Sequence, residues 1–302
     1  MPSVLTHYYC ALRVLRELEK KNISVQRDAF IWGTQGPDIF FYHRFMPWKK
    51  ESSLTYMGKR IHNEPPSLYL ETCGKILREH KFSEPMRSYV LGTVCHYMLD
   101  REAHPFVLAK TKDYSQKIKK KEKNYPWHTQ IETSLDIIIL RYETGGLPTD
   151  VSIKMCTPKD EEIMAQIGRF WQEFLRYRFD KDISEREGAQ LAQDMRSLFG
   201  LLNNRLLIKK PALECFERLT GAGSKLSCHL RAISEGELDY ANNLRRPWCA
   251  PLEPEKVRHD SFFDIYEQTI IKTPKMISDF LICAKKERSM AELCEEKSFS
   301  GR

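Results

Sequence analysis

The stretch from Val94 to Phe106 constrains most strongly what this chain can fold into. As a helix, it places His96, Asp100 and His104 four residues apart, so two imidazoles and one carboxylate rise along a single face. The residues between them are mostly apolar, which predicts a helix that is buried on most of its sides. Buried polar groups need partners. The stretch therefore predicts either a metal site or a hydrogen-bond network, and by itself it leaves both open.

The rest of the chain is interpreted as a succession of helices. Residues 3–21 carry leucines and tyrosines at helical spacing with arginines and glutamates opposite, which is typical of an amphipathic helix. The central helix is expected over 83–104, with Pro105 at its end. Further helical patterns occupy 58–62, 66–79, 127–141, 159–179, 184–205, 209–232 and 261–286, and a shorter segment at 234–244 precedes a proline-rich connection at 246–254.

Alternation of apolar and polar residues over the length of a strand is hard to find in this sequence. We therefore predict an all-α fold, a multi-helix bundle. It is expected to be a single domain over 1–289, with the candidate ligands within 1–140 and further helices that complete the domain over 150–289. Residues 290–302 are expected to be a frayed tail.

Composition and the N-terminal sequence narrow the classes of function. No apolar run approaches the roughly 18 residues that span a bilayer, so no transmembrane segment is expected. Residues 1–7 lack the features of a secretory signal, which makes a cytoplasmic location the expectation and leaves export by an unconventional route open. Nine cysteines without a CxxC spacing fit a reducing compartment. The net charge of +7 permits anionic partners without requiring them.

Further residues with metal-binding side chains lie outside the central stretch. His128 and Glu132 are four residues apart and share one helix face, and a Gly-Pro turn holds Asp38 in a loop. The candidate ligands are His7, Asp38, His62, His96, Asp100, His104, His128 and Glu132. Such nitrogen and oxygen ligands suit zinc, and eight exceed the three or four of one tetrahedral site. The sequence therefore predicts a multinuclear zinc site between helices of the N-terminal half.

The other four histidines, His43, His80, His229 and His259, are interpreted as structural residues. A lysine-rich segment, Lys110–Lys123, is too polar to be core and is interpreted as a solvated loop or helix end. The alternative is a patch that attracts an anionic substrate, a nucleic acid or lipid headgroups. Because the segment lies between His104 and His128, it begins and ends beside the candidate ligands, which keeps this alternative open.

In their order and spacing, the ligands resemble those of the zinc-dependent phospholipase C family, whose fold is shared with the fungal single-strand-specific zinc nucleases. The motifs are Thr6-His7, Gly36-Pro37-Asp38, His62, His96-x3-Asp100 followed by His104-Pro105, and His128-x3-Glu132. The resemblance implies two zinc ions, one bound by Asp38, His62, His96 and Asp100 and one by His104, His128 and Glu132. It also implies a third ion that His7 and Asp100 share, with Asp100 bridging.

Two features differ from secreted members of that family. They have an N-terminal tryptophan that completes the third site, whereas no tryptophan precedes His7 here; after removal of Met1, the amine of Pro2 is the candidate substitute. Toxin-like members also have a membrane-docking β-sandwich, whereas residues 150–290 here are expected to be helical. Three later pieces, Asn242-Asn243-Leu244, Pro247-Trp248 and Ser261-Phe262-Phe263-Asp264, also resemble bacterial members and are assigned no chemistry.

The resemblance implies hydrolysis of phosphodiester bonds. Two neighbouring zinc ions activate a water molecule, and Asp38 is the carboxylate expected to orient or deprotonate it. The leading hypothesis is a zinc-dependent phosphodiesterase of the phospholipase C type, which acts on a phospholipid or a small anionic phosphodiester and makes a peripheral membrane contact. The alternatives are a single-strand-specific nuclease, which would bind nucleic acid, and a non-catalytic metal-binding or interaction protein.

Overall fold

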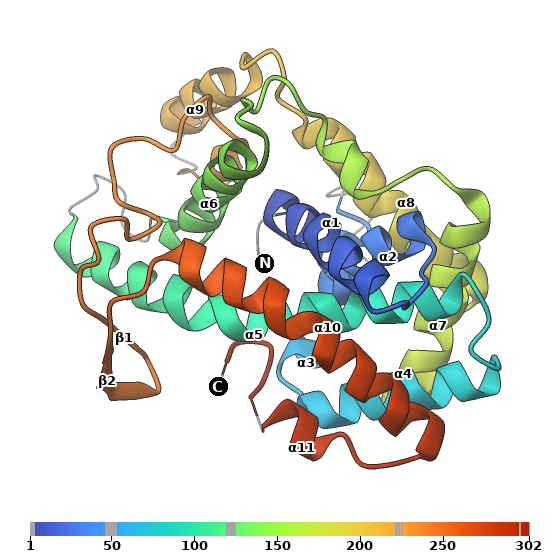
Figure 1. Cartoon of the computed structure of the whole chain (residues 1–302). Coiled ribbons are helices and arrows are strands. Elements are labelled where there is room, and N and C mark those ends of the chain that lie inside the picture. Colours follow the sequence, from blue (N-terminus) through green and yellow to red (C-terminus); the bar gives the residue numbers. More distant parts are fainter. Residues whose placement is uncertain are drawn as a thin grey trace.

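The longest helix, α5 (Met86–Lys117), runs through the middle of the structure (Figure 1). This computed structural model describes residues 4–45, 53–118, 125–220, 224, 226–295 and 297–301. The other elements are α1 (Val4–Lys20), α2 (Arg27–Gly33), η1 (Gly36–Tyr42), α3 (Thr55–His62), α4 (Pro66–Glu79), α6 (Trp127–Thr144), η3 (Ile153–Cys156), α7 (Glu161–Phe179), α8 (Glu185–Leu202), α9 (Lys209–Thr220), η4 (Ser227–His229), β1 (Trp248–Ala250), β2 (Glu253–Arg258), α10 (Phe262–Lys286) and α11 (Ala291–Cys294). The predicted all-α class is confirmed.

Helices α1, α6 and α10 pack against α5, and α7 packs against α8. Helix α2 crosses α5 at close range because both helices carry a glycine there. A Cβ atom on Gly33 would lie 2.0 Å from the Tyr89 carbonyl oxygen, and one on Gly92 would lie 2.2 Å from that of Phe30. This backbone-to-backbone contact brings the chain that follows α2 alongside His96.

The prediction that Pro105 ends the central helix is wrong, because α5 continues to Lys117 with Pro105 inside it. A proline in a helix interior costs about 3 kcal/mol, since it lacks an N–H group and its ring crowds the preceding turn. Packing beyond the proline offsets this cost. The ring of Phe106 is fully buried, with its centroid 5.2 Å from that of Trp248 and 5.7 Å from that of Phe262.

The single helix predicted over 209–232 is also wrong. The structure describes α9 over Lys209–Thr220, and residues 226–232 form a turn, the short η4 and irregular chain instead of a continuing helix. Residues 234–244 form turns rather than a helix. The proline-rich connection contains an antiparallel hairpin, in which Trp248 of β1 pairs with Arg258 of β2.

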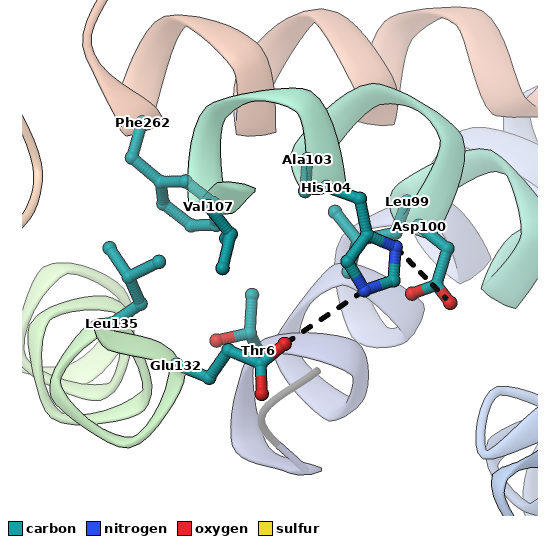
Figure 2. Close-up of a pocket in the computed structure, with 9 residues that line it drawn as sticks. All are labelled: Thr6, Leu99, Asp100, Ala103, His104, Val107, Glu132, Leu135 and Phe262. Carbon is teal, nitrogen blue, oxygen red and sulfur yellow. Dashed lines mark ion pairs between the residues drawn. The ribbon is translucent and has the colours of Figure 1, made fainter. Parts of the chain in front are cut away.

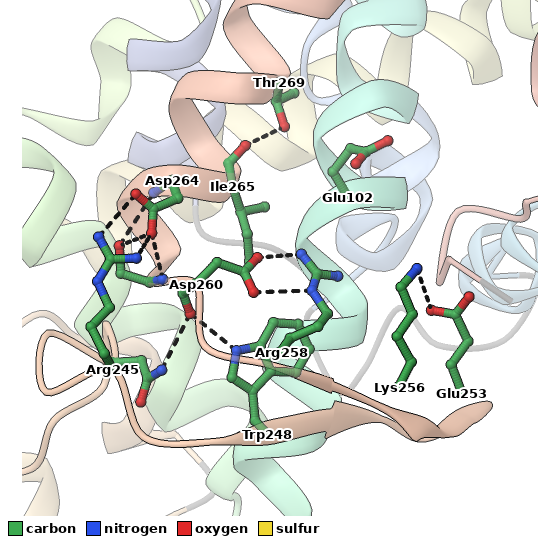
Figure 3. Close-up of polar contacts among 12 residues, drawn as sticks. Glu102, Arg245, Trp248, Glu253, Lys256, Arg258, Asp260, Asp264, Ile265 and Thr269 are labelled. Atoms are coloured by element: carbon green, nitrogen blue, oxygen red, sulfur yellow. Dashed lines mark hydrogen bonds and ion pairs between the residues drawn. The ribbon is translucent and has the colours of Figure 1, made fainter.

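A polar network joins this hairpin to the start of α10 (Figure 3). The Trp248 indole N–H donates to the Asp260 carbonyl oxygen at 3.0 Å, and the Arg258 guanidinium donates to the Asp260 carboxylate. Ser261 caps α10 in a capping box with Asp264, whose carboxylate also pairs with Arg245. The three later motifs to which the sequence analysis assigned no chemistry are thus structural, and they support the second half of α5.

The lysine-rich segment is not uniformly solvated. Lys110 is buried and donates to the Asn242 side-chain oxygen at 2.9 Å, so this lysine belongs to the packed structure. Burial lowers the pKa of its ammonium group. Residues 119–124, with four of the lysines, lie outside the described residues, and so does Pro2.

The tail predicted to be frayed is ordered where it is described. Residues 291–294 form α11, and the Phe299 side chain is fully buried. The Tyr97 hydroxyl donates to the Lys297 carbonyl oxygen at 2.6 Å, which fixes this segment against α5. The prediction failed because a single buried aromatic ring outweighs the polar composition around it. Within the described residues, no helix combines the length and hydropathy that a membrane crossing requires.

Candidate metal centre

Five elements deliver the eight predicted ligands. His7 lies near the start of α1, Asp38 in η1 and His62 at the end of α3, while α5 and α6 supply the rest. The structure brings all eight together in three groups whose ligand atoms lie within 4.8 Å of one another: His7, His96 and Asp100; Asp38, His62 and His96; and His104, His128 and Glu132. We call these eight residues the metal centre. The predicted ligand sets are thus close in space, and which ion each set holds stays a prediction.

Asp100 lies in the middle of the metal centre and is fully buried. Its Oδ1 atom is 3.2 Å from His7 Nε2, and its Oδ2 atom is 3.3 Å from His96 Nε2 and 3.7 Å from His62 Nε2. His62 Nε2 is also 3.2 Å from the Asp38 carboxylate. One carboxylate is therefore surrounded by three imidazole nitrogens from three helices, an arrangement that suits a bridging ligand.

The third group joins α5 to α6. His104 lies one turn beyond Asp100 on α5, and His128 and Glu132 lie on α6. Figure 2 shows the His104 ring between the carboxylates of Asp100 and Glu132. The His104 Nε2 atom is 3.9 Å from Glu132 Oε1, and the His128 Nε2 atom is 2.9 Å from the same oxygen. His128 is the most exposed of the three, at 32%, so this side of the metal centre opens toward solvent.

Three of the histidine rings are oriented by backbone carbonyl groups. His62 Nδ1 lies 2.6 Å from the Gly58 carbonyl oxygen, His96 Nδ1 lies 3.0 Å from that of Thr34, and His104 Nδ1 lies 2.8 Å from that of Phe299. A ring that donates from Nδ1 presents Nε2 as an acceptor, which is the usual arrangement of a metal-bound histidine. The backbone thus selects the tautomer that a cation requires.

Several buried polar atoms of the metal centre make no hydrogen bond within the described part of the chain. They are the Nε2 atoms of His7 and His96, Oδ1 of Asp38, and both carboxylate oxygens of Asp100. Buried polar atoms in folded proteins are nearly always satisfied, so such a concentration requires an explanation. Acceptor nitrogens and carboxylate oxygens that converge on one space fit a divalent cation, and this donor set suits zinc.

The charges of the metal centre are strongly coupled. Burial alone would raise the pKa of Asp100, but the surrounding histidines, led by His96, hold it well below its usual value, so Asp100 is ionised. Burial would lower the pKa of His62, but the nearby Asp100 and Asp38 carboxylates raise it to about 9. Without a metal ion, a proton on His62 balances these carboxylates.

A glycine allows η1 to lie against the metal centre. Gly36 has a φ angle of +49°, and a Cβ atom there would lie 2.4 Å from His96 Cδ2. Pro37 then starts the short helix and places Asp38 in its first turn. The Gly-Pro pair predicted a turn from the sequence; the contact with His96 emerges only from the fold.

The sequence analysis missed two residues that help to position the candidate ligands. The Phe299 ring packs against His62 with centroids 5.0 Å apart, while its carbonyl group orients His104. The only sequence signal is one aromatic residue among serines and a glycine. Asp136 accepts from the Thr6 backbone N–H at 2.7 Å and from Arg231, which fixes the start of α1 next to His7.

The remaining histidines lie outside the three groups. His80 pairs with Glu173 at 2.9 Å, His43 Nδ1 accepts from the Leu54 backbone N–H, and His259 lies near the Arg245 carbonyl oxygen.

A small cavity of about 20 Å³ adjoins His104, Asp100 and Glu132, and it is large enough for about one water molecule (Figure 2).

Comparison with known proteins agrees with this arrangement. Residues 6–181 match the model of a family described as zinc dependent phospholipase C, and all eight candidate ligands lie within that range. Comparisons with curated proteins and with solved structures gave no match.

Proposed function

The chain belongs to the zinc-dependent phospholipase C family, and from this premise we propose that it hydrolyses the phosphodiester bond of a phospholipid. The observation that carries the proposal is the set of unsatisfied histidine nitrogens and carboxylate oxygens around Asp100. We assign Asp38, His62, His96 and Asp100 to one zinc ion and His104, His128 and Glu132 to a second. His7 and Asp100 would share a third ion.

When bound, the zinc ions supply Lewis acidity to the phosphoryl oxygens and lower the pKa of water. The protein contributes position and charge. Backbone carbonyl groups fix the imidazoles, and the buried Asp100 supplies negative charge at the centre. Asp38 is buried with its carboxylate 3.2 Å from His62 Nε2, and this carboxylate would orient the attacking water and take its proton.

The first test is the zinc content of the purified, reconstituted protein, with fewer than one zinc per chain as the result that overturns the proposal. The zinc-loaded protein is then assayed on phosphatidylcholine, a soluble phosphodiester and single-stranded DNA. Turnover of DNA alone would identify a nuclease, and no turnover of any of the three substrates with zinc present would favour a non-catalytic metal-binding protein.

A matched pair of variants tests the role of Asp38. Asp38→Asn with zinc retained should lower kcat by about 10²- to 10⁴-fold, the usual contribution of a positioned general base. Asp28→Asn, which changes an exposed carboxylate on α2, is the control and should retain full turnover. Equal kcat values for the two variants would contradict the assignment.

A further inference from the structure

A cavity of about 950 Å³ lies beside the metal centre, bounded by α6, α8 and α9. This volume is at the upper end of the range of small-molecule pockets, about 300–1,000 Å³. Thr129, Glu132 and Thr133 of α6 form part of its wall. Because Glu132 also belongs to the group with His104 and His128, the cavity reaches the metal centre.

The walls of this cavity suit an apolar ligand. They are built mainly from side chains such as Phe41, Phe199, Leu202 and Leu213. The two cations among the lining residues already have partners: Arg231 binds Asp136, and Lys209 Nζ donates to the Leu201 carbonyl oxygen at 2.8 Å. These cations therefore offer a ligand little electrostatic attraction, and the burial of apolar surface is the main favourable contribution to binding in this cavity.

Helix α9 forms one wall without filling the space. Glu217 is its buried residue, and Glu217 Oε1 accepts from the Leu226 backbone N–H at 2.6 Å. On the same side, Lys210 Nζ donates to the Ser227 carbonyl oxygen at 2.9 Å. These polar contacts attach α9 to the rest of the protein, while Leu213 and Phe216 line the cavity. The apolar face of α9 is thus left for a ligand to cover.

The mouth of the cavity is apolar as well. Leu201, Phe216 and Leu226 line it and are also 55–59% exposed. Leu219, also on α9, is 82% exposed and is not among the residues that line the cavity. Exposed apolar side chains gathered around an opening are typical of a site where an apolar ligand enters. An amphiphile could insert its chain here while its polar end lies at Glu132.

We propose that this cavity binds an acyl chain of the lipid whose phosphodiester group lies at the metal centre. The identity of that lipid rests on the proposed function; the capacity for an alkyl chain rests on the cavity alone. Helices α8 and α9 follow residue 181, where the family match ends. The part of the cavity wall that α8 and α9 form therefore lies outside the residues that the family model matches.

Alkanol binding tests the cavity independently of zinc and of turnover. Calorimetric titration of the zinc-free protein with hexanol, octanol and decanol should show affinity rising with length, by at most about fourfold per buried methylene. Leu213→Trp, which fills the cavity, should weaken decanol binding at least tenfold. Leu219→Trp introduces the same ring on the exposed face of α9 and should bind decanol as the native chain does. If Leu213→Trp does not fold, Ala212→Phe fills the same space.

Equal decanol affinities for the filled and control variants would overturn the proposal, and so would the absence of a chain-length dependence. In hydrolysis assays on monomeric phosphatidylcholines, Leu213→Trp should lower the ratio of kcat/KM for dihexanoyl to dibutanoyl substrate at least tenfold, and Leu219→Trp should not. Equal losses on vesicles for both variants, without alkanol binding, would instead indicate a surface contact with the membrane and overturn the acyl site. Alkanol binding without any hydrolysis would refute the proposed function alone.

Discussion

Two buried aspartates on neighbouring helices, Asp100 of α5 and Asp136 of α6, are both fully inaccessible to solvent, but their surroundings differ. Asp136 Oδ1 accepts from the Thr6 backbone N–H and hydroxyl, and its Oδ2 accepts from the Arg231 guanidinium. Asp100 makes no hydrogen bond through either oxygen to any described residue, and histidine nitrogens lie 3.2–3.7 Å away.

The difference separates a structural carboxylate from a proposed metal ligand. A buried charge needs either donors that satisfy it within the chain or an ion from outside. Asp136 has the donors and joins α1, α6 and the segment that carries Arg231. Asp100 is surrounded by imidazoles, and two of them, His62 and His96, engage the backbone through Nδ1, so their Nε2 atoms and the Asp100 oxygens converge on the same space.

The largest expected effect is that of Asp100→Asn on the metal centre. The amide supplies neither the charge nor the bridging oxygen, so zinc content should fall by at least one ion per chain and activity by on the order of 10⁴-fold. The folded state should survive, because the change also removes a buried charge. Metal analysis, with turnover on phosphatidylcholine, measures the effect. Full zinc content in this variant would remove the distinction between the two aspartates.

Asp136→Asn should lower the stability of the fold and leave the zinc content unchanged, the opposite of what is expected for Asp100→Asn. It leaves the Arg231 guanidinium buried without its counter-charge, which should lower the free energy of unfolding by about 3–5 kcal/mol. Urea denaturation of the zinc-loaded protein measures the loss, and zinc content should stay unchanged. The double variant Asp136→Asn/Arg231→Met is the control and should recover part of the stability. A drop in zinc content as large as that of Asp100→Asn would contradict a structural role.

Phe299→Ala tests whether residues 297–301 act on the metal centre. Removing a fully buried ring should cost about 3 kcal/mol of stability. Because the Phe299 carbonyl group orients His104, zinc affinity should also fall on the order of 10-fold, as for other outer-shell partners. Competition with a chelator measures the affinity, and Phe299→Leu, which keeps the site filled, is the control. Lost stability at unchanged affinity would make the segment purely structural.

Trp248→Phe should have the smallest effect. It removes the hydrogen bond from the indole to the Asp260 carbonyl oxygen while keeping an aromatic ring against Phe106. The expected loss is about 1 kcal/mol in thermal or urea denaturation. Zinc content and turnover should match the native chain, since this network is satisfied without an ion. A change in zinc content would show that the hairpin influences the metal centre through α5.

Local patterns in the sequence predicted much of this structure correctly. The helical spacing of apolar residues gave the positions of α1, α6, α7, α8 and α10 to within a few residues, and the order of the eight ligands indicated the family. Pro105 misled because local propensity disfavours a helix there, and only the packing of Phe106 on Trp248 shows why the helix continues. Phe299 was missed because a contact between residues 299 and 104 leaves no periodic signal.

The sequence by itself determined which side chains are available and which of them share a helix face, because periodicity within one element depends only on local geometry. His96, Asp100 and His104 were aligned in this way, as were His128 and Glu132. Only the tertiary structure decided how the five elements meet, since that depends on close contacts such as Gly33 against Gly92 and Gly36 against His96. It also decided which buried aspartate has its hydrogen bonds satisfied, because donors such as Arg231 come from distant parts of the chain.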